Sequence, residues 1–266
     1  MKIARFAHRD SSVGDVSFGI VEGLDEHDEP TPSTQISELD GHPFGTTDLT
    51  GVVFPFSDVR LLAPVIPSKI IAVGRNYAAH IEEMGSTVPD EPMIFLKPST
   101  SIIGPGDTIR LPASSSEVDH EAELAVVIGR LCRNVPVETA LDVVLGYTCS
   151  NDVSARDHQR SDGQWGRAKG FDTFCPLGPW IATNVDPADL RITCSVGDDL
   201  RQDSTTALLL RDVATLVSWI SGVMTLLPGD VILTGTPAGV GRITAGDVVQ
   251  VSIDGIGTLE NPVDHG

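Results

Sequence analysis

Short apolar segments, separated by turns that contain glycine or proline, recur along the chain from residue 67 onward. Each is too short for a typical helix and most are rich in β-branched residues, which is typical of buried strands. Glycine (26) and proline (18) are abundant among the 266 residues, and aromatic residues make up only 5%. The segments cover residues 70–73, 93–96, 124–128, 143–147, 179–182, 192–196, 231–233 and 248–253. This pattern predicts a β-rich α+β fold whose main body is a rolled or sandwiched sheet.

The first part of the chain has a different character. Short candidate strands at residues 2–6, 16–21 and 52–54 are separated by an acidic, proline-containing stretch at 25–32. We expect a small β-rich N-terminal domain over residues 1–65 and a larger domain over residues 66–266. A chain of this length can bury one large core together with one small appended unit.

Composition excludes several classes of partner. The formal net charge of −19 argues against binding to nucleic acid or to an anionic membrane surface. No apolar run approaches the length of a membrane span, and the first residues lack the apolar core of a signal peptide. The four cysteines form no CxxC motif, so reduced and buried thiols are expected. A soluble, intracellular (cytoplasmic) protein is therefore predicted.

Three carboxylates flank two of the apolar segments. Glu121 and Glu123 precede the segment at 124–128, and residues two apart on a strand point to the same face. Asp152 follows the strand predicted at 143–150 and could complete the group. Like charges at the edge of a core favour a cation between them, and oxygen ligands without cysteine or histidine suit Mg²⁺, Mn²⁺ or Ca²⁺. The alternative is that the two glutamates are merely solvated strand ends.

A histidine and a glutamate share one face of a short predicted helix. The helix is expected over residues 77–84, capped by Asn76 and ended by Gly85, with His80 and Glu83 three positions apart. A carboxylate beside an imidazole orients the ring and can assist it in activating water. A chance pair on an exposed helix is the simpler alternative. A second amphipathic helix, expected over residues 211–227, carries nothing catalytic.

Two further segments allow more than one interpretation. Arg156, Arg160, Arg167 and Lys169 gather in an otherwise acidic chain, which favours a site for an anion, although salt bridges to nearby aspartates would also explain them. The glycine-rich segment 235–241 lacks both the GxGxxG spacing and the lysine of a phosphate-binding loop. A turn that faces a substrate and a purely structural turn are both compatible with it.

The motifs taken together resemble the fumarylacetoacetate hydrolase family over about residues 67–265. The likeness is greatest to bacterial members known as 2-hydroxyhepta-2,4-diene-1,7-dioate isomerases and to acylpyruvate hydrolases. The motifs, in chain order, are Gly74-Arg75-Asn76-Tyr77 with His80 and Glu83, Phe95-Leu96-Lys97-Pro98, His120-Glu121 with Glu123-Leu124, Asn151-Asp152 with Ser154-Ala155-Arg156-Asp157, Lys169-Gly170-Phe171-Asp172, and Thr234-Gly235-Thr236-Pro237.

The resemblance implies a role for each matching residue. It implies Mg²⁺ or Mn²⁺ as cofactor, a homodimer, and a β-sandwich roll with a small N-terminal domain. The implied metal ligands are Glu121, Glu123 and Asp152. The implied catalytic residues are His80 and Glu83, which would activate water, and Lys169, which would hold the substrate's carboxylate or oxyanion. The implied substrate contacts are Arg75, Gln159 and Thr236.

The resemblance also implies an activity on small 2-oxo acids through a metal-stabilised enolate. The expected reaction is hydrolysis of a carbon–carbon bond of an acylpyruvate-type β-diketo acid. The alternatives are isomerisation of 2-hydroxyhepta-2,4-diene-1,7-dioate and decarboxylation of an oxaloacetate-type acid, or, outside enzymes, a non-catalytic binding protein that a metal stabilises. Segment 161–166 lacks the tyrosine found in relatives that act on fumarylacetoacetate, which counts against that substrate. Gly170 stands where many relatives have serine.

Overall fold

The longer sheet runs through both the N-terminal segment and the body of the molecule. In the computed structural model, which describes residues 1–9 and 16–266, its strands follow the order β4-β3-β2-β1-β14-β12-β11-β17-β6-β7, with β5 paired to β1 and β8 to β14. The bounds are β1 Lys2–His8, β2 Val16–Leu24, β3 Pro30–Leu39, β4 Leu49–Pro55, β5 Val59–Leu62, β6 Ile70–Gly74, β7 Met93–Lys97, β8 Ile102–Ile103, β11 Ala122–Ile128, β12 Val144–Asn151, β14 Cys175–Ala182 and β17 Val231–Leu233.

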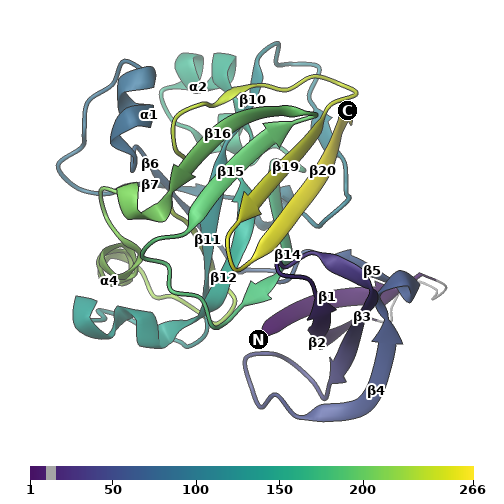
Figure 1. Cartoon of the computed structure of the whole chain (residues 1–266). Coiled ribbons are helices and arrows are strands. Elements are labelled where there is room, and N and C mark those ends of the chain that lie inside the picture. The colour runs from purple at the N-terminus through teal and green to yellow at the C-terminus, as the bar shows by residue number, and fades with distance from the viewer. Residues whose placement is uncertain (10–15) are drawn as a thin grey trace.

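A second sheet and a small three-strand group complete the β structure that the model describes (Figure 1). The second sheet has the order β16-β15-β19-β20-β9, and the small group has the order β13-β10-β18. The bounds are β9 Ile109–Leu111, β10 Val118–His120, β13 Ser154–Ala155, β15 Arg191–Val196, β16 Asp199–Thr205, β18 Gly241–Arg242, β19 Val248–Ile253 and β20 Gly257–His265.

Helices in the described residues are short and lie in the connections. The α-helices are α1 Ala78–Glu83, α2 Arg156–Asp162, α3 Gly166–Gly170 and α4 Val213–Val223. The 3₁₀ turns are η1 Phe56–Asp58, η2 Ser99–Ser101, η3 Val137–Val143 and η4 Thr206–Leu208. None of the helices described is long and apolar enough to cross a membrane.

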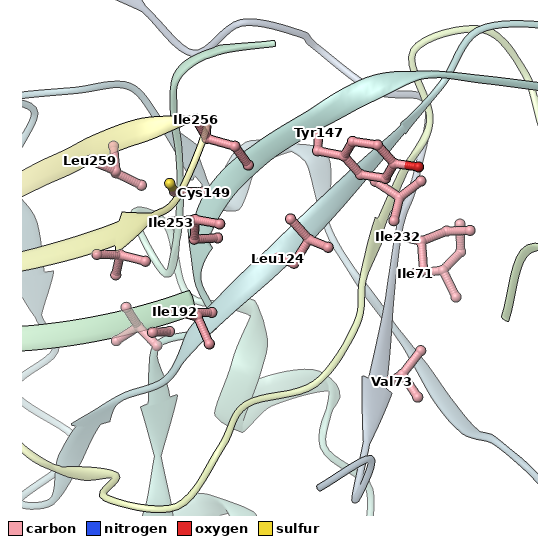
Figure 2. Packing of buried hydrophobic residues seen from close by; sticks show 14 of the residues in the cluster. Ile71, Val73, Leu124, Tyr147, Cys149, Ile192, Ile232, Ile253, Ile256 and Leu259 are labelled. Atoms are coloured by element: carbon pink, nitrogen blue, oxygen red, sulfur yellow. The ribbon is translucent and has the colours of Figure 1, made fainter. Parts of the chain in front are cut away.

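Strand β11 is buried on both faces, which explains its continuous apolar sequence. Leu124 and Val126 belong to the core between the two sheets, whereas Ala125 and Val127 pack on the opposite face of the long sheet. Figure 2 shows the first of these cores, where Leu124 lies among side chains from β12, β15, β19 and β20. The alternation along the strand places Glu123 on the same face as Ala125 and Val127.

The N-terminal strands gather on one side of the molecule (Figure 1). They have a small core of their own, in which Phe6 and Ile36 pack with Trp180 of β14. Strand β1 continues the long sheet through its pairing with β14, where Ile3 lies opposite Ile181. The division at residues 65 and 66 stays a prediction, because pairing in a common sheet does not define a boundary.

The β-rich fold predicted from the apolar segments is confirmed, and each of those segments lies wholly or almost wholly in a strand. The pattern did not reveal β3, β5, β16 or β20. Several of these strands expose many of their residues and carry polar side chains, so they contain no continuous apolar run. The prediction of free, buried cysteines is also confirmed, since all four are buried and none forms a disulfide.

Two expectations about helices are wrong. The helix that begins after Tyr77 has no side-chain cap, because Asn76 instead donates to the carbonyl oxygens of Thr234 and Arg211 and accepts from the Arg211 amide. The second helix covers only Val213–Val223, with the Asp212 carboxylate accepting from the Thr215 amide at its start. The backbone is already extended at Met224, although the apolar residues continue beyond that point.

Candidate active site

Glu121, Glu123 and Asp152 lie together at the end of strands β11 and β12. One carboxylate oxygen from each lies within 4.8 Å of the others, and each residue is at most 4% exposed. Glu121 precedes β11, Glu123 is its second residue, and Asp152 directly follows β12. The two strands are antiparallel neighbours with Ala122 opposite Asn151, and the Asp152 amide donates to the Glu121 carbonyl at 2.8 Å. Strand pairing therefore brings together three carboxylates that come from two places in the sequence.

Buried cations neutralise two of the three carboxylates. Lys169 Nζ donates at 2.6 Å to both Glu121 Oε2 and Asp152 Oδ2. Lys97 donates to the other oxygen of Asp152, and Arg156 Nη1 lies 2.7 Å from Glu121 Oε1. All three cations are 3% exposed or less. Burial of these lysines, the arginine and the carboxylates of Glu121 and Asp152 is tolerable because each of them has a partner of opposite charge.

Glu123 differs from its two neighbours. In the described residues it forms no ion pair, and it accepts a hydrogen bond from the Gly235 amide at 2.7 Å. Burial and the charges of Asp152 and Glu121 raise the pKa of Glu123 well above its usual value. Burial alone would also raise the pKa of Glu121, but Lys169 and Arg156 outweigh it and hold that pKa low.

The donor set fits a divalent cation. Three buried carboxylate oxygens within reach of one another are hard ligands of the kind that Mg²⁺ and Mn²⁺ prefer. Burial and the charges of Asp152 and Glu121 disfavour the ionised form of Glu123, and the paired lysines and arginine do not offset this effect. A cation among the three carboxylates would favour that ionised form.

His80 and Glu83 form the contact expected from their spacing. His80 Nδ1 lies 3.1 Å from Glu83 Oε2, and the Gly239 amide donates at 3.0 Å to the other oxygen of Glu83. The His80 side chain is 10% exposed and that of Glu83 is 34% exposed. The neighbouring Glu82 is exposed and lies outside this contact. Nδ1 faces Glu83, and Nε2 of His80 has no hydrogen-bond partner in residues 1–9 and 16–266, so Nε2 can exchange a proton with a group in the cavity described next.

A cavity of about 220 Å³ joins the carboxylates to His80. Every predicted site residue except Glu83 lines the cavity. Glu83 does not line it but contacts His80, which does. The lining residues among those predicted are Arg75, His80, Glu121, Glu123, Asp152, Gln159, Lys169 and Thr236. Their proximity makes a common site possible, while the role of each stays a prediction.

The turn after β6 brings Arg75 to the cavity. Arg75 has φ +59°, a left-handed conformation that is uncommon for residues with a side chain. The next residue, Asn76, is 1% exposed and binds the backbone of two distant segments, at Thr234 and Arg211. Asn76 therefore braces the segment between β6 and α1 rather than capping the helix.

Sequence reasoning missed several residues of this site. Lys97 was noticed only as part of a motif, although a lysine that ends an apolar segment was itself a signal of a buried partner. Trp165 lines the cavity and contacts Phe95 edge to face, with ring centroids 5.3 Å apart, and nothing in the sequence pointed to it. Gly170 packs against the Pro98 ring, so a side chain there would be crowded by that ring.

The basic cluster divides between the two interpretations that the sequence allowed. Arg156, Arg160 and Lys169 line the cavity, although Arg156 also pairs with Asp119 and Arg160 with Glu117. Arg167 instead pairs with Asp162, with Nε 2.7 Å from the carboxylate, in an exposed salt bridge. The Nη2 atom of Arg156 is buried without a hydrogen-bond partner in the described residues, so its guanidinium retains an unused donor.

Comparisons with known proteins identify the family of this chain. The family model "Fumarylacetoacetate (FAA) hydrolase C-terminal" matches residues 69–264, and the model "Rv2993c-like, N-terminal" matches residues 1–64. The chain belongs to the fumarylacetoacetate hydrolase family. Its relatives include proteins named as isomerases, hydrolases and tautomerases.

Two curated relatives and two solved structures are examples of proteins that are similar to this chain. The chain is 56% identical to Protein Rv2993c of Mycobacterium tuberculosis, over 99% of this chain and 98% of that protein. It is 49% identical to the mitochondrial oxaloacetate tautomerase fahd2 of Xenopus laevis, over 78% of this chain and 69% of that protein. The structure of a 5-carboxymethyl-2-hydroxymuconate delta-isomerase from Mycobacterium smegmatis is 54% identical in sequence, with a TM-score of 0.91. The structure of a maleylpyruvate hydrolase from Sphingobium sp. SYK-6, in complex with manganese(II) and pyruvate, is 34% identical, with a TM-score of 0.79. Both alignments cover 100% of each chain.

Proposed function

We propose that this chain is a divalent-metal-dependent enzyme, using Mg²⁺ or Mn²⁺, that acts on a small 2-oxo acid through its enol form. The observation that carries the proposal is the single cavity in which three buried carboxylates face a histidine held by a glutamate. A cation held by Glu121, Glu123 and Asp152 would supply Lewis-acid stabilisation of negative charge that develops on the 2-oxo oxygen.

The chain's own residues supply binding and proton transfer. Lys169 and the unused donor of Arg156 place positive charge beside the carboxylates, where the substrate's carboxylate would bind. His80, oriented by Glu83, would accept a proton at Nε2 from water or from the substrate and return it later. Phe95 and Trp165 line the cavity with apolar ring surface, which would limit the access of water to a bound substrate.

For a substrate with a second carbonyl, we propose hydrolysis of a carbon–carbon bond. A water molecule loses a proton to His80 and its oxygen bonds to the distal carbonyl carbon. The bond between that carbon and C3 of the 2-oxo acid then breaks, and its electron pair remains on the 2-oxo acid as the enolate. Protonation at C3 gives pyruvate, and the distal fragment leaves as a carboxylic acid.

Keto–enol tautomerisation of an oxaloacetate-type acid is the second candidate. It uses the proton-transfer step without the attack of water, so the same residues suffice. The similarity to the oxaloacetate tautomerase of Xenopus laevis, at 49% identity, supports this candidate, whereas the similarity to a maleylpyruvate hydrolase, at 34% identity, supports the first. Isomerisation of a dienol acid would also need only proton transfer, and the similarity to the Mycobacterium smegmatis isomerase, at 54% identity, supports that variant.

One set of assays separates these outcomes. Acylpyruvates are followed by loss of enol absorbance together with release of pyruvate, enol-oxaloacetate by formation of the keto form, and the dienol acid by its change in absorbance. Each assay is run with MgCl₂, MnCl₂ or EDTA, for the wild type and for His80→Ala. Pyruvate release from acylpyruvates identifies a hydrolase, whereas ketonisation without it identifies a tautomerase. No metal-dependent turnover of any of these substrates would contradict the proposal and favour a binding protein.

A further inference from the structure

Gln202 is a fully buried amide that bonds a residue of the cavity wall, and it lies on a strand that otherwise exposes many of its residues. It lies on β16 of the second sheet and has 0% exposure. Its Oε1 atom accepts from the Ala122 amide at 3.0 Å and lies 3.2 Å from His120 Nδ1. Its Nε2 atom donates at 2.8 Å to both Thr236 Oγ1 and the Pro237 carbonyl. Each polar atom of the amide thus has two neighbours within hydrogen-bonding distance.

The orientation of this amide is fixed by two backbone groups. The Ala122 amide can only donate, so it must face the oxygen of Gln202. The Pro237 carbonyl can only accept, so it must face the nitrogen. A flipped amide would place like groups against each other at both ends.

The orientation of Gln202 determines what the Thr236 hydroxyl can do. Because the amide nitrogen of Gln202 only donates, Thr236 Oγ1 must accept, and the hydroxyl proton is left for another partner. No second partner of that hydroxyl lies in residues 1–9 or 16–266, and Thr236 lines the cavity. Its proton is therefore available to an acceptor inside the cavity.

Gln202 also ties together two segments that carry the site. Ala122 lies between Glu121 and Glu123, while the segment with Thr236 begins at Gly235, whose amide donates to Glu123. The side chain from the second sheet thus holds the loop at a fixed distance from the carboxylates. Gln202 would make the same contacts if it served only to join the two sheets. The positioning role differs from this structural role in requiring the Thr236 hydroxyl to donate to a ligand in the cavity.

We propose that Gln202 is a positioning residue that holds the Thr236 hydroxyl as a hydrogen-bond donor to the anionic oxygen of the bound 2-oxo acid. This inference rests on the proposed function, because it needs an anionic ligand in the cavity. It predicts a loss of ligand affinity when the amide becomes a carboxylate. A carboxylate at position 202 still accepts from Ala122, but it also accepts from Thr236 and turns the hydroxyl proton away from the ligand.

The test measures binding of oxalate, a stable planar analogue of a 2-oxo acid enolate, by calorimetry in the presence of MnCl₂. Gln202→Glu and Thr236→Val should each weaken oxalate binding about 10- to 100-fold, the range expected for one hydrogen bond to a charged group. The double variant should bind oxalate no more weakly than either single variant, since both changes remove the same donor. Thr236→Ser, which keeps the hydroxyl, should bind within about threefold of the wild type.

Controls separate this role from a general structural one. Gln250→Glu changes an amide in the same sheet that bonds Glu260 and Ser195, and it should leave oxalate binding unchanged. Titration with MnCl₂ alone should give similar affinities for the wild type and Thr236→Val. Unchanged oxalate binding by Thr236→Val, or additive losses in the double variant, would overturn the inference even if Gln202→Glu did not fold. Absence of oxalate binding by the wild type would instead count against the proposed function.

Discussion

The carboxylate cluster and helix α1 face the same cavity but are held in very different ways. Glu121, Glu123 and Asp152 lie at the ends of central strands, wholly buried and surrounded by Lys97, Lys169 and Arg156. Helix α1 has only six residues, follows a turn in which Arg75 has a positive φ, and leaves the Glu83 side chain one-third exposed. The cluster has the rigidity of the core, whereas α1 depends on a few contacts.

This difference indicates that the carboxylate cluster and helix α1 have different roles in the site. Ligands of a cation must hold their positions, and strands in the middle of a sheet do so. A group that exchanges protons with a changing substrate can tolerate small displacements, and a short helix at the surface permits them. We therefore expect changes in the cluster to affect metal binding and stability, and changes in α1 to affect turnover alone.

The largest effect is expected from Glu123→Ala. This change removes one of three ligands and, with it, the carboxylate that no side-chain cation neutralises in the described residues. Metal-dependent turnover should fall below detection, and calorimetric titration with MnCl₂ should show no tight site. Glu260→Gln, on β20, serves as the control and should behave as the wild type. Full activity of Glu123→Ala would contradict the assignment of metal binding to the carboxylate cluster and of proton exchange to helix α1.

Replacing His80 by alanine should reduce kcat by about 10²- to 10⁴-fold, the usual contribution of a proton-transfer group. Mn²⁺ affinity should be unchanged, because His80 is not among the three clustered carboxylates. Glu83→Gln should reduce kcat less, since the amide can still orient the ring. The matched control is Glu82→Gln on the same helix, which should keep full activity. An equal loss in Glu82→Gln would contradict the pairing that we assign to Glu83.

Lys97→Met should destabilise the protein by about 3–5 kcal/mol, because removal of one partner leaves the buried Asp152 charge without one of its two cations. Urea denaturation of the protein in EDTA measures this loss. Arg167→Ala removes an exposed salt bridge to Asp162 and should leave the midpoint unchanged within error. Similar midpoints for both variants would show that burial of the cluster matters less than we infer.

The smallest effect is expected from Asp157→Asn, outside the cavity. Burial would raise the pKa of Asp157, but the Ser116 amide, the Ser115 hydroxyl and the His158 amide outweigh it and lower that pKa to about 2. An acid with a lowered pKa in the folded state stabilises the protein above its unfolded pKa and loses this contribution as the pH falls toward 2. Asp157→Asn should be slightly less stable at pH 7. The difference from the wild type should shrink between pH 5 and pH 3 in denaturation experiments, and a difference independent of pH would contradict the assignment.

Residues with a chemical signature could be found in the sequence. Glu121 and Glu123 were visible because charges beside an apolar run need a partner, and His80 with Glu83 was visible through helical spacing. Gln202 had no such signal, since a single amide in a polar strand resembles many exposed residues. Its importance arises only when the second sheet packs behind Ala122, which is a tertiary relation that spacing along the chain does not encode.

The fold shows a similar division. Strands such as β11 and β17, buried on both faces, could be predicted because their apolar runs are continuous. The strands β3 and β16 are only partly buried and carry many polar residues, so their sequences do not distinguish them from loops. The cap expected at Asn76 failed because its amide bonds two distant backbone segments instead of its own helix. Local rules gave the wrong partner where long-range packing supplied a better one.

The central claim, that the three carboxylates hold a divalent cation, can be tested most directly by anomalous X-ray diffraction from crystals grown with MnCl₂. The account predicts one strong manganese peak within coordination distance of Glu121, Glu123 and Asp152, and no such peak at this site in crystals of Glu123→Ala. A wild-type crystal with no manganese at these carboxylates, or with manganese bound only elsewhere, would contradict the account.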